Sequence, residues 1–315
     1  MNLNTLKGKK AFSHASLLLI LLAICILLTI VRPSFLSYRN IFNLLRSMSI
    51  TGFIAIGMTF VIITGGIDLS VGSVVGFSSV MCGVFMKNMG WGIWPSLFVI
   101  TLLCLLVGLI NGALIHYGRL PEFIATLGTM QMLRGLAMLI TNGRLISGLP
   151  ESFTNFAQLN ILGLPSLCIV WLIVILAAAY LLRYSTYGRN IYAVGSNREA
   201  SRLSGIKLAP TICGTYMINA LCACVAGILL TSRVTSAQPA AGEGYEMEAI
   251  AAAVIGGASL SGAEGSVAGT VIGAVIMAVL TNGGNLLGIN SFIIDIVIGA
   301  LIVLAVLIEK NKKAR

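Results

Sequence analysis

The chain has 315 residues, of which 57% are hydrophobic and only 10% are charged. Soluble domains carry about 25% charged residues, so this composition excludes a soluble globular enzyme and also an intrinsically disordered chain. The formal net charge of +10 comes from 20 Lys and Arg residues against 10 Asp and Glu residues, and nearly all of the basic residues lie at the termini and in loops. They are not interleaved with aromatic residues, so they do not indicate a nucleic-acid partner.

Apolar stretches in this chain are continuous and longer than the roughly ten alternating residues of a barrel strand. They predict an all-α polytopic membrane protein, since about 20 apolar residues in a helix cross a hydrocarbon core of about 30 Å. In chain order we predict about ten membrane-spanning helices, over residues 14–31, 47–64, 70–87, 95–117, 121–142, 164–183, 209–231, 247–259, 265–284 and 290–308. They form a single transmembrane domain over residues 1–315.

Basic residues predict the orientation of these helices. With ten spans, the termini and loops on one side carry 13 Lys and Arg residues, and the loops on the other side carry six. Basic residues accumulate on the cytoplasmic side, so we expect both termini in the cytoplasm of a multi-pass protein of the inner (plasma) membrane. Arg32, Arg39 and Arg46 go against this bias, and we expect a short interfacial helix there, with its arginines among the lipid headgroups.

One short sequence occurs twice between hydrophobic segments. Residues 65–70 read Gly-Gly-Ile-Asp-Leu-Ser, residues 256–261 read Gly-Gly-Ala-Ser-Leu-Ser, and each copy is followed by Gly-Ser-Val-x-Gly. Gly-interrupted segments at matching positions in two halves of a chain point to a transport pathway. The same glycines would also suit tight turns or close helix packing. The residues predicted along the pathway are Gly65, Gly66, Asp68, Ser70, Thr126, Gly256, Gly257 and Ser261.

Two charged residues near or within the spans each have two interpretations. Asp68 precedes a predicted helix start, which favours a helix N-cap over a gate residue in the pathway. Arg134 lies well inside a predicted span. We expect its side chain to extend to the outer interface rather than to line the pathway or to pair between helices.

Motifs of covalent chemistry are absent from the sequence. It contains no Walker A pattern, only two histidines, and seven cysteines that all lie in apolar stretches without a Cys-x-x-Cys pair. The cysteines are interpreted as small buried hydrophobic residues. No catalytic residue, metal ligand or cofactor site is predicted.

Residues 183–207 are too polar to span a membrane and are predicted to form a cytoplasmic loop. Ser196 and Glu199 have the spacing of a capping box, and Gly205 is a typical helix stop. The helix between them, residues 197–204, is too short to be stable alone. Leu203 lies on its apolar face. The helix therefore either docks to a separate ATPase or belongs to a solvated connecting loop.

The residues of this loop also carry a family resemblance. Gly188-Arg-Asn-Ile-Tyr-Ala-Val-Gly-Ser-Asn197, followed by Ala200 and Ser204-Gly-Ile206, resembles the coupling loop of ABC-importer permeases of the ribose/monosaccharide type. Further matching segments follow that family's order over about residues 33–308; they are 65–73, 121–129, 134–135 and 248–262. One departure is Ala263-Glu264 before Gly265-Ser266, where the family often has Gly-Gly-Arg/Lys-Gly-Ser.

This resemblance implies a cobalamin-importer-like (type II) ABC permease fold. It implies two permease chains, identical or different, an ATP-binding subunit on one side and a sugar-binding protein on the other, with a monosaccharide as the transported solute. The permease would catalyse no covalent reaction, because ATP hydrolysis would belong to the ATP-binding subunit. The residues it assigns to ATPase coupling are Gly188, Arg189, Gly195, Asn197, Glu199, Ala200, Leu203, Ser204 and Gly205.

Two other classes of membrane protein are the alternatives. An ion-coupled secondary transporter or channel for a small polar solute would usually carry carboxylates in mid-span, whereas the acidic residues here lie near span ends. An integral-membrane enzyme would need a clustered set of His, Asp and Glu, which this sequence does not offer.

Overall fold

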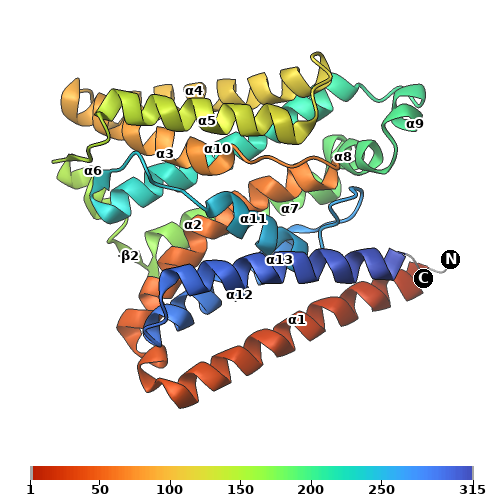
Figure 1. Ribbon diagram of the computed structural model, residues 1–315, viewed down its shortest axis with the longest axis horizontal. Coiled ribbons are helices and arrows are strands. Elements are labelled where there is room, and N and C mark those ends of the chain that lie inside the picture. Colours follow the sequence, from red (N-terminus) through yellow and green to blue (C-terminus); the bar gives the residue numbers. More distant parts are fainter. Residues whose placement is uncertain (1–2, 314–315) are drawn as a thin grey trace.

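The computed structural model describes residues 3–313 of the chain. Arg315, one of the predicted cytoplasmic basic residues, lies outside them. Long helices run side by side between two ends of the molecule (Figure 1). They and the shorter helices are α1 (Leu3–Val31), α2 (Tyr38–Ile63), α3 (Val71–Cys82), α4 (Ile93–His116), α5 (Glu122–Thr141), α6 (Glu151–Phe156), α7 (Ser166–Tyr184), α8 (Thr186–Ser196), α9 (Arg198–Leu203), α10 (Leu208–Val234), α11 (Tyr245–Ile255), α12 (Val267–Leu286) and α13 (Ser291–Lys313).

Short elements connect some of these helices. A 3-10 helix (η1, Pro33–Leu36) precedes α2, and a π-helix (η2, Gly83–Asn88) continues α3. Four strands of two residues each form two antiparallel pairs. They pair β1 (Ile146–Ser147) with β4 (Ser236–Ala237), and β2 (Asn160–Ile161) with β3 (Leu164–Pro165).

Within the described residues, seven helices are long and apolar enough to cross a membrane: α2, α3 with η2, α4, α5, α7, α10 and α12. Shorter apolar helical stretches lie in α1 and α13, at Ala15–Val31 and Ser291–Leu307. Helix α11 has only 11 residues. The prediction of an all-α polytopic membrane protein is confirmed, and the count of ten spans stays a prediction.

Some predicted helix boundaries differ from the structure. The helix predicted over 47–64 already begins at Tyr38, where the Ser37 side chain accepts a hydrogen bond from the Asn40 amide, and the short helix expected near Arg32 is the 3-10 helix η1 that precedes it. The helix predicted over 70–87 changes to a π-helix at Gly83. The helix predicted over 247–259 ends at Ile255, because the chain turns at the glycine pair that follows.

Helices α2 and α10 form the centre of the bundle. α10 packs against α2, α3 and α4, and α2 also packs against α7, α11 and α12. Phe53 and Phe60 of α2 are fully buried. Gly108 of α4 lets the α10 backbone approach closely, since a Cβ there would lie 2.5 Å from the Tyr216 carbonyl oxygen. Small residues at such contacts are typical of helix packing in membranes.

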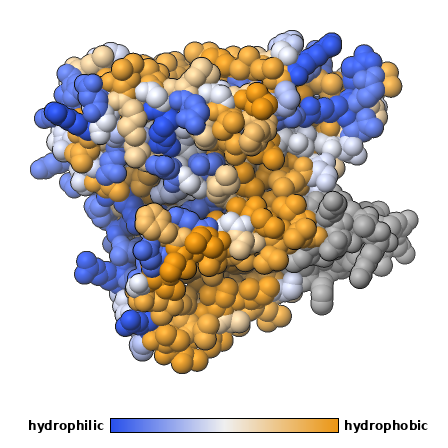
Figure 2. Space-filling view, viewed as in Figure 1, coloured by the Kyte–Doolittle hydropathy of each residue, from blue (hydrophilic) through white to orange (hydrophobic). Residues whose placement is uncertain are grey.

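Polar and apolar surfaces are separated along the helices. Hydrophilic residues gather at the two ends, over α8 and α9 at one end and around α6 and β2 at the other, while hydrophobic residues cover most of the helices between (Figure 2). The start of α1 and the end of α13 lie at the end that carries α8 and α9 (Figure 1). This separation is the one that a bilayer requires of a multi-pass helical protein.

Candidate translocation and coupling site

The first Gly-Gly segment interrupts the chain between α2 and α3. The Gly65 amide donates to the Ile62 carbonyl at 2.9 Å, and the Gly66 amide donates to the Val61 carbonyl at 3.1 Å. Gly65 has a φ of 80°. This is the left-handed cap that ends many helices, and glycine adopts it without a steric penalty. Residues 64–70, which we name the first break, then lead to α3.

The second Gly-Gly segment ends α11 in the same way. The Gly257 amide donates to the Val254 carbonyl at 2.9 Å, and the Ala258 amide donates to the Ala253 carbonyl at 2.9 Å. Here the second glycine of the pair is left-handed, with a φ of 92°. The first, Gly256, faces α12, where a Cβ would overlap the Gly269 backbone. Residues 256–266, the second break, then lead to α12.

The repeat extends to the side chains inside the two breaks. Asp68 Oδ1 accepts hydrogen bonds from the Ser70 amide at 2.9 Å and from the Ser70 hydroxyl at 2.6 Å. At the equivalent position, Ser259 Oγ accepts one from the Ser261 amide at 3.1 Å. The expectation that Asp68 caps a helix is wrong, because Ser70 occupies the N-cap position of α3. Asp68 instead stabilises the turn that precedes this helix.

Side chains from three other helices hold the first break. Asn219 of α10 donates to Asp68 Oδ2 at 2.9 Å, and Asn111 of α4 donates to the Ser70 hydroxyl at 3.0 Å. Thr129 of α5 donates to Asn111 Oδ1 at 2.6 Å. All five side chains are buried, so the break is fixed by a polar network in an apolar surrounding.

Sequence reasoning missed three members of this network, Asn111, Thr129 and Asn219. Their signal was an amide or hydroxyl side chain within an apolar span, which needs a partner inside the protein. Thr126, which was predicted along the pathway, lies at the same place. Its hydroxyl is 3.3 Å from the carbonyl oxygen of Ile67 in the first break and 2.9 Å from that of Glu122.

Arg134 of α5 does not extend to the outer interface as predicted. Its Nη1 donates to the carbonyl oxygens of Pro239 and Ala241 at 2.8 and 3.0 Å. It thereby ties α5 to the segment that precedes α11. In α11 itself, Glu248 accepts a hydrogen bond from the buried Thr51 hydroxyl of α2 at 3.1 Å. The sequence had not suggested either contact.

Residues 186–196 of the predicted coupling loop form α8. The Ser185 hydroxyl caps it by accepting a hydrogen bond of 2.9 Å from the Gly188 amide. Ile191 and Val194 point into the bundle and are fully buried, whereas Arg189 is exposed. Tyr192 donates to the carbonyl oxygen of Gly265 in the second break at 2.9 Å. One face of helix α8 therefore packs against the helical bundle.

Helix α9 is shorter than predicted and is capped differently. Asn197, not Ser196, is its N-cap, and Asn197 Oδ1 accepts a hydrogen bond from the Ala200 amide at 2.9 Å. Ser196 remains the last residue of α8, because the chain only becomes extended at Asn197. The predicted stop at Gly205 is confirmed by a φ of 84° and a bond of 3.0 Å from its amide to the Arg202 carbonyl.

The surface of α9 is exposed and carries both signs of charge. Leu203 is 75% exposed. Arg202 donates to Glu199 within the helix, and this hydrogen bond lowers the pKa of the Glu199 carboxyl below its ordinary value. Arg198 donates to Glu122 at the start of α5 at 2.5 Å. An exposed leucine within a rim of charged residues is a typical arrangement for a protein-docking surface.

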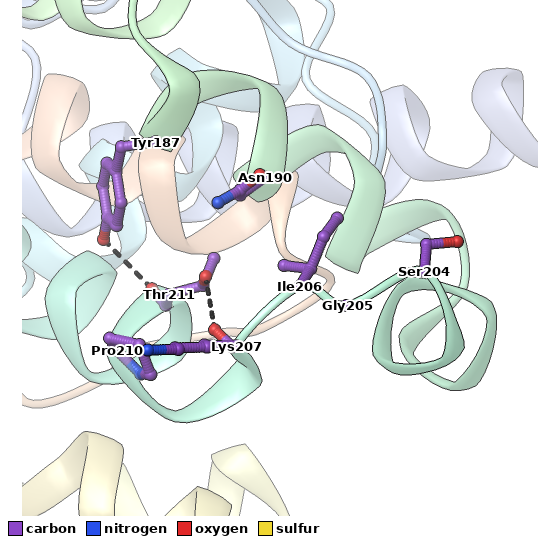
Figure 3. Close-up of a pocket in the computed structure, with 8 residues that line it drawn as sticks. All are labelled: Tyr187, Asn190, Ser204, Gly205, Ile206, Lys207, Pro210 and Thr211. Carbon is purple, nitrogen blue, oxygen red and sulfur yellow. Dashed lines mark hydrogen bonds between the residues drawn. The ribbon is translucent and has the colours of Figure 1, made fainter.

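A recess of about 380 Å³ lies beside α9, between α8 and the start of α10 (Figure 3). Tyr187 closes one side by donating to the Thr211 carbonyl at 3.0 Å. Ser204, at the other end, directs its hydroxyl away from Tyr187 (Figure 3). The lining residues are Tyr187, Asn190, Ser204, Gly205, Ile206, Lys207, Pro210 and Thr211. The recess is large enough for one side chain of a docked protein.

The structure divides the predicted coupling residues into two groups. Gly188 and Gly195 of α8 face the bundle, and the other seven, from Arg189 to Gly205, are exposed. Within residues 3–313, no group of three or more His, Cys, Asp or Glu side chains has the geometry to hold a metal ion. The seven cysteines are free thiols, and all but Cys25 are buried.

The chain is similar to known transport permeases. The family model described as "Branched-chain amino acid transport system / permease component" matches residues 40–306. The ribose import permease protein RbsC of Bacillus subtilis is 44% identical over 93% of this chain and 92% of its own length. RbsC of Escherichia coli K12 is 40% identical over 99% and 100%. The xylose transport system permease protein XylH of the same strain is 35% identical over 90% and 87%. No solved structure matches.

Proposed function

The chain belongs to the family of branched-chain amino acid transport system permease components, and we propose that it is the membrane-spanning subunit of an ATP-driven monosaccharide importer. Its relatives of 35 to 44% identity are named as permeases for ribose and xylose, so the proposed solute is a pentose of this kind. No covalent reaction is assigned to the chain itself.

The observation that carries the proposal is the exposed helix α9. Its six residues are too few for a helix to be stable alone, and it is fixed by caps at both ends and by α8 behind it. Leu203, the last residue of α9, is exposed to water in the isolated chain. An ATP-binding subunit that covers Leu203 would remove this apolar surface from water and receive a rigid contact in return.

The remaining partners follow from the same assignment. A second permease chain, identical or different, would complete the pathway, and a sugar-binding protein would deliver the sugar at the end that carries α6 and β2. In this orientation α8, α9 and both termini are cytoplasmic, as the charge bias predicts. Nucleotide-driven movement of α8 and α9 would shift the population between inward- and outward-facing states.

The breaks are the proposed gates of the pathway. A neutral sugar with many hydroxyl groups requires small residues and weak polar groups rather than a charged trap. Most residues of both breaks are Gly, Ala, Ser or Thr, and the only charged ones are Asp68 and Glu264. Asp68 is buried and accepts three hydrogen bonds within the protein. These hydrogen bonds indicate that Asp68 stabilises the break rather than binds a coupling ion. They therefore favour an ATP-driven importer over an ion-coupled transporter.

Reconstitution tests this function. The chain is co-purified with its ATP-binding subunit and placed in proteoliposomes, and uptake of radiolabelled D-ribose and D-xylose is measured with the sugar-binding protein. We expect uptake of one of these pentoses that needs ATP and survives collapse of ion gradients by ionophores. Uptake that persists without ATP and stops when the ion gradient collapses would instead identify an ion-coupled transporter.

A further inference from the structure

The end of α8 lies against both breaks at once. Gly195, in the last turn of α8, has no room for a side chain, because a Cβ would overlap the carbonyl oxygen of Ile63 and lie 2.8 Å from the Ala263 amide nitrogen. Ile63 is the last residue of α2, directly before the first break, and Ala263 belongs to the second break. A helix that approaches two other backbones this closely needs glycine at the contact.

The two breaks are also bonded to each other at this point. The Ala263 amide donates a hydrogen bond of 2.9 Å to the Ile63 carbonyl. A Cβ on Gly262 would lie 2.6 Å from the Gly195 carbonyl oxygen and 3.1 Å from the Gly65 amide nitrogen. Three backbone segments that are distant in sequence therefore meet without intervening side chains. We name this contact of Ile63, Gly195 and Ala263 the junction.

A second contact from α8 reaches only one of the breaks. Tyr192, one turn before Gly195, donates to the Gly265 carbonyl at 2.9 Å. The side chains of Ile191 and Val194, each one residue before these two positions, are buried and fix α8 to the bundle. Only one extended residue, Asn197, connects α8 to α9. We therefore expect a displacement of α9 to move α8 as well.

From these contacts we infer that the junction transmits movement of α8 and α9 to both breaks together, with Gly195 as its positioning residue. A contact between side chains can absorb a displacement when a side chain changes its rotamer, but a contact between backbones cannot. Movement of α8 therefore shifts the end of α2 and the second break in the same step. This inference rests on the proposed function, since it concerns how nucleotide binding on a separate subunit reaches the pathway.

Hydrogen–deuterium exchange on the complete importer tests the inference without depending on the sugar. The complex is measured with and without ATP and vanadate, for the unchanged chain, for Gly195→Ala and for Ser196→Ala. In Gly195→Ala the nucleotide response at residues 198–206 should persist, while the responses of residues 64–70 and 256–266 are lost. Uptake of D-ribose or D-xylose per ATP hydrolysed should fall by about 5- to 150-fold, the usual range of coupling between sites. Ser196 is exposed, so Ser196→Ala should match the unchanged chain.

Tyr192→Phe serves as a second variant, because it removes one hydrogen bond and adds no atoms. It should weaken the response of residues 256–266 more than that of residues 64–70. Unchanged responses of both breaks in Gly195→Ala, or in Tyr192→Phe where Gly195→Ala does not assemble, would overturn the inference. If residues 198–206 of the unchanged complex show no nucleotide response, the proposed function itself is wrong. If residues 198–206 respond to nucleotide while neither break does, only the inference about the junction is wrong.

Discussion

The side-chain amide of Asn219 donates a hydrogen bond of 2.9 Å to Oδ2 of Asp68, and through this bond the central helix α10 holds the break between α2 and α3. Asp68 is 1% exposed. No salt bridge to it is found within residues 3–313. Three hydrogen-bond donors thus replace water around a buried carboxylate, which otherwise would be costly to bury.

Replacement of Asp68 should destabilise the permease. Asp68→Ala leaves the buried amides of Ser70 and Asn219 without an acceptor, at a cost of about 1–3 kcal/mol for each unsatisfied group. Asp68→Asn keeps an acceptor oxygen and should cost less. Thermal unfolding in detergent measures the difference, with Glu264→Ala as the control, since Glu264 is exposed in the second break. Equal melting temperatures for Asp68→Ala and Glu264→Ala would contradict this role.

The glycines of the two breaks should resist the same substitution for different reasons. A Cβ on Gly66 would lie 2.7 Å from Tyr216 Oη, a buried hydroxyl that has no hydrogen-bond partner in the described structure. At Gly257 space is open, and only its φ of 92° disfavours a side chain. We expect Gly66→Leu and Gly257→Leu both to block uptake while membrane insertion persists.

A second substitution separates the two causes. Tyr216→Phe removes the obstructing hydroxyl and should partly restore uptake to Gly66→Ala, but it should not help Gly257→Ala. Gly128→Ala is the control, because Gly128 lies in α5 with open space around its Cβ position. Restoration of Gly257→Ala by Tyr216→Phe would show that the strain argument is wrong.

Leu203 should be the apolar anchor for the ATP-binding subunit. Loss of a buried anchor costs about 2 kcal/mol or more at an interface, so Leu203→Glu should sharply lower co-purification of that subunit. Leu162 provides a matched control: it is 96% exposed and lies beside β2 at the opposite end. Leu162→Glu should leave co-purification unchanged. Equal losses in the two variants would point to general misfolding.

The ion pair between Arg198 and Glu122 should contribute little. The two side chains are 43% and 24% exposed, and water screens such pairs, which usually contribute about 0.2–1 kcal/mol. A double-mutant cycle with Arg198→Ala and Glu122→Ala, read by thermal unfolding, should give a coupling energy in this range. A coupling of about 3 kcal/mol, as for a desolvated pair, would mean that another chain covers this surface.

The N-cap of α9 should depend on Asn197 rather than on Ser196. Asn197→Ala removes the acceptor for the Ala200 amide and should destabilise α9 by about 1 kcal/mol. Hydrogen exchange of residues 198–206 in the isolated permease measures this as faster exchange. Ser196→Ala should leave it unchanged. Faster exchange in Ser196→Ala instead would restore the capping box that the sequence suggested.

Much of the fold could be predicted because a membrane constrains it strongly. The lengths of the apolar stretches predicted the helices, because the backbone of a chain in lipid must satisfy its own hydrogen bonds. Most ends fell within a few residues of the observed ones, as for α4 and α5. The start of α9 was predicted wrongly because two neighbouring residues compete to be its N-cap. Ser196 and Asn197 are both good N-caps, and only the packing of α8 decides which residue leaves the helix.

The sequence by itself determined the membrane class, the family resemblance, the repeated Gly-Gly breaks and the exposed helix near Leu203, because each rests on local composition or on a contiguous motif. The contacts between these parts were decided only by the tertiary structure. Asn219 reaches Asp68, and Gly195 meets Ile63, through the packing of helices that are far apart along the chain. A pattern of residues fixes which face of a helix is polar or small. It does not fix which backbone that face meets, because partner choice depends on the geometry of the whole bundle.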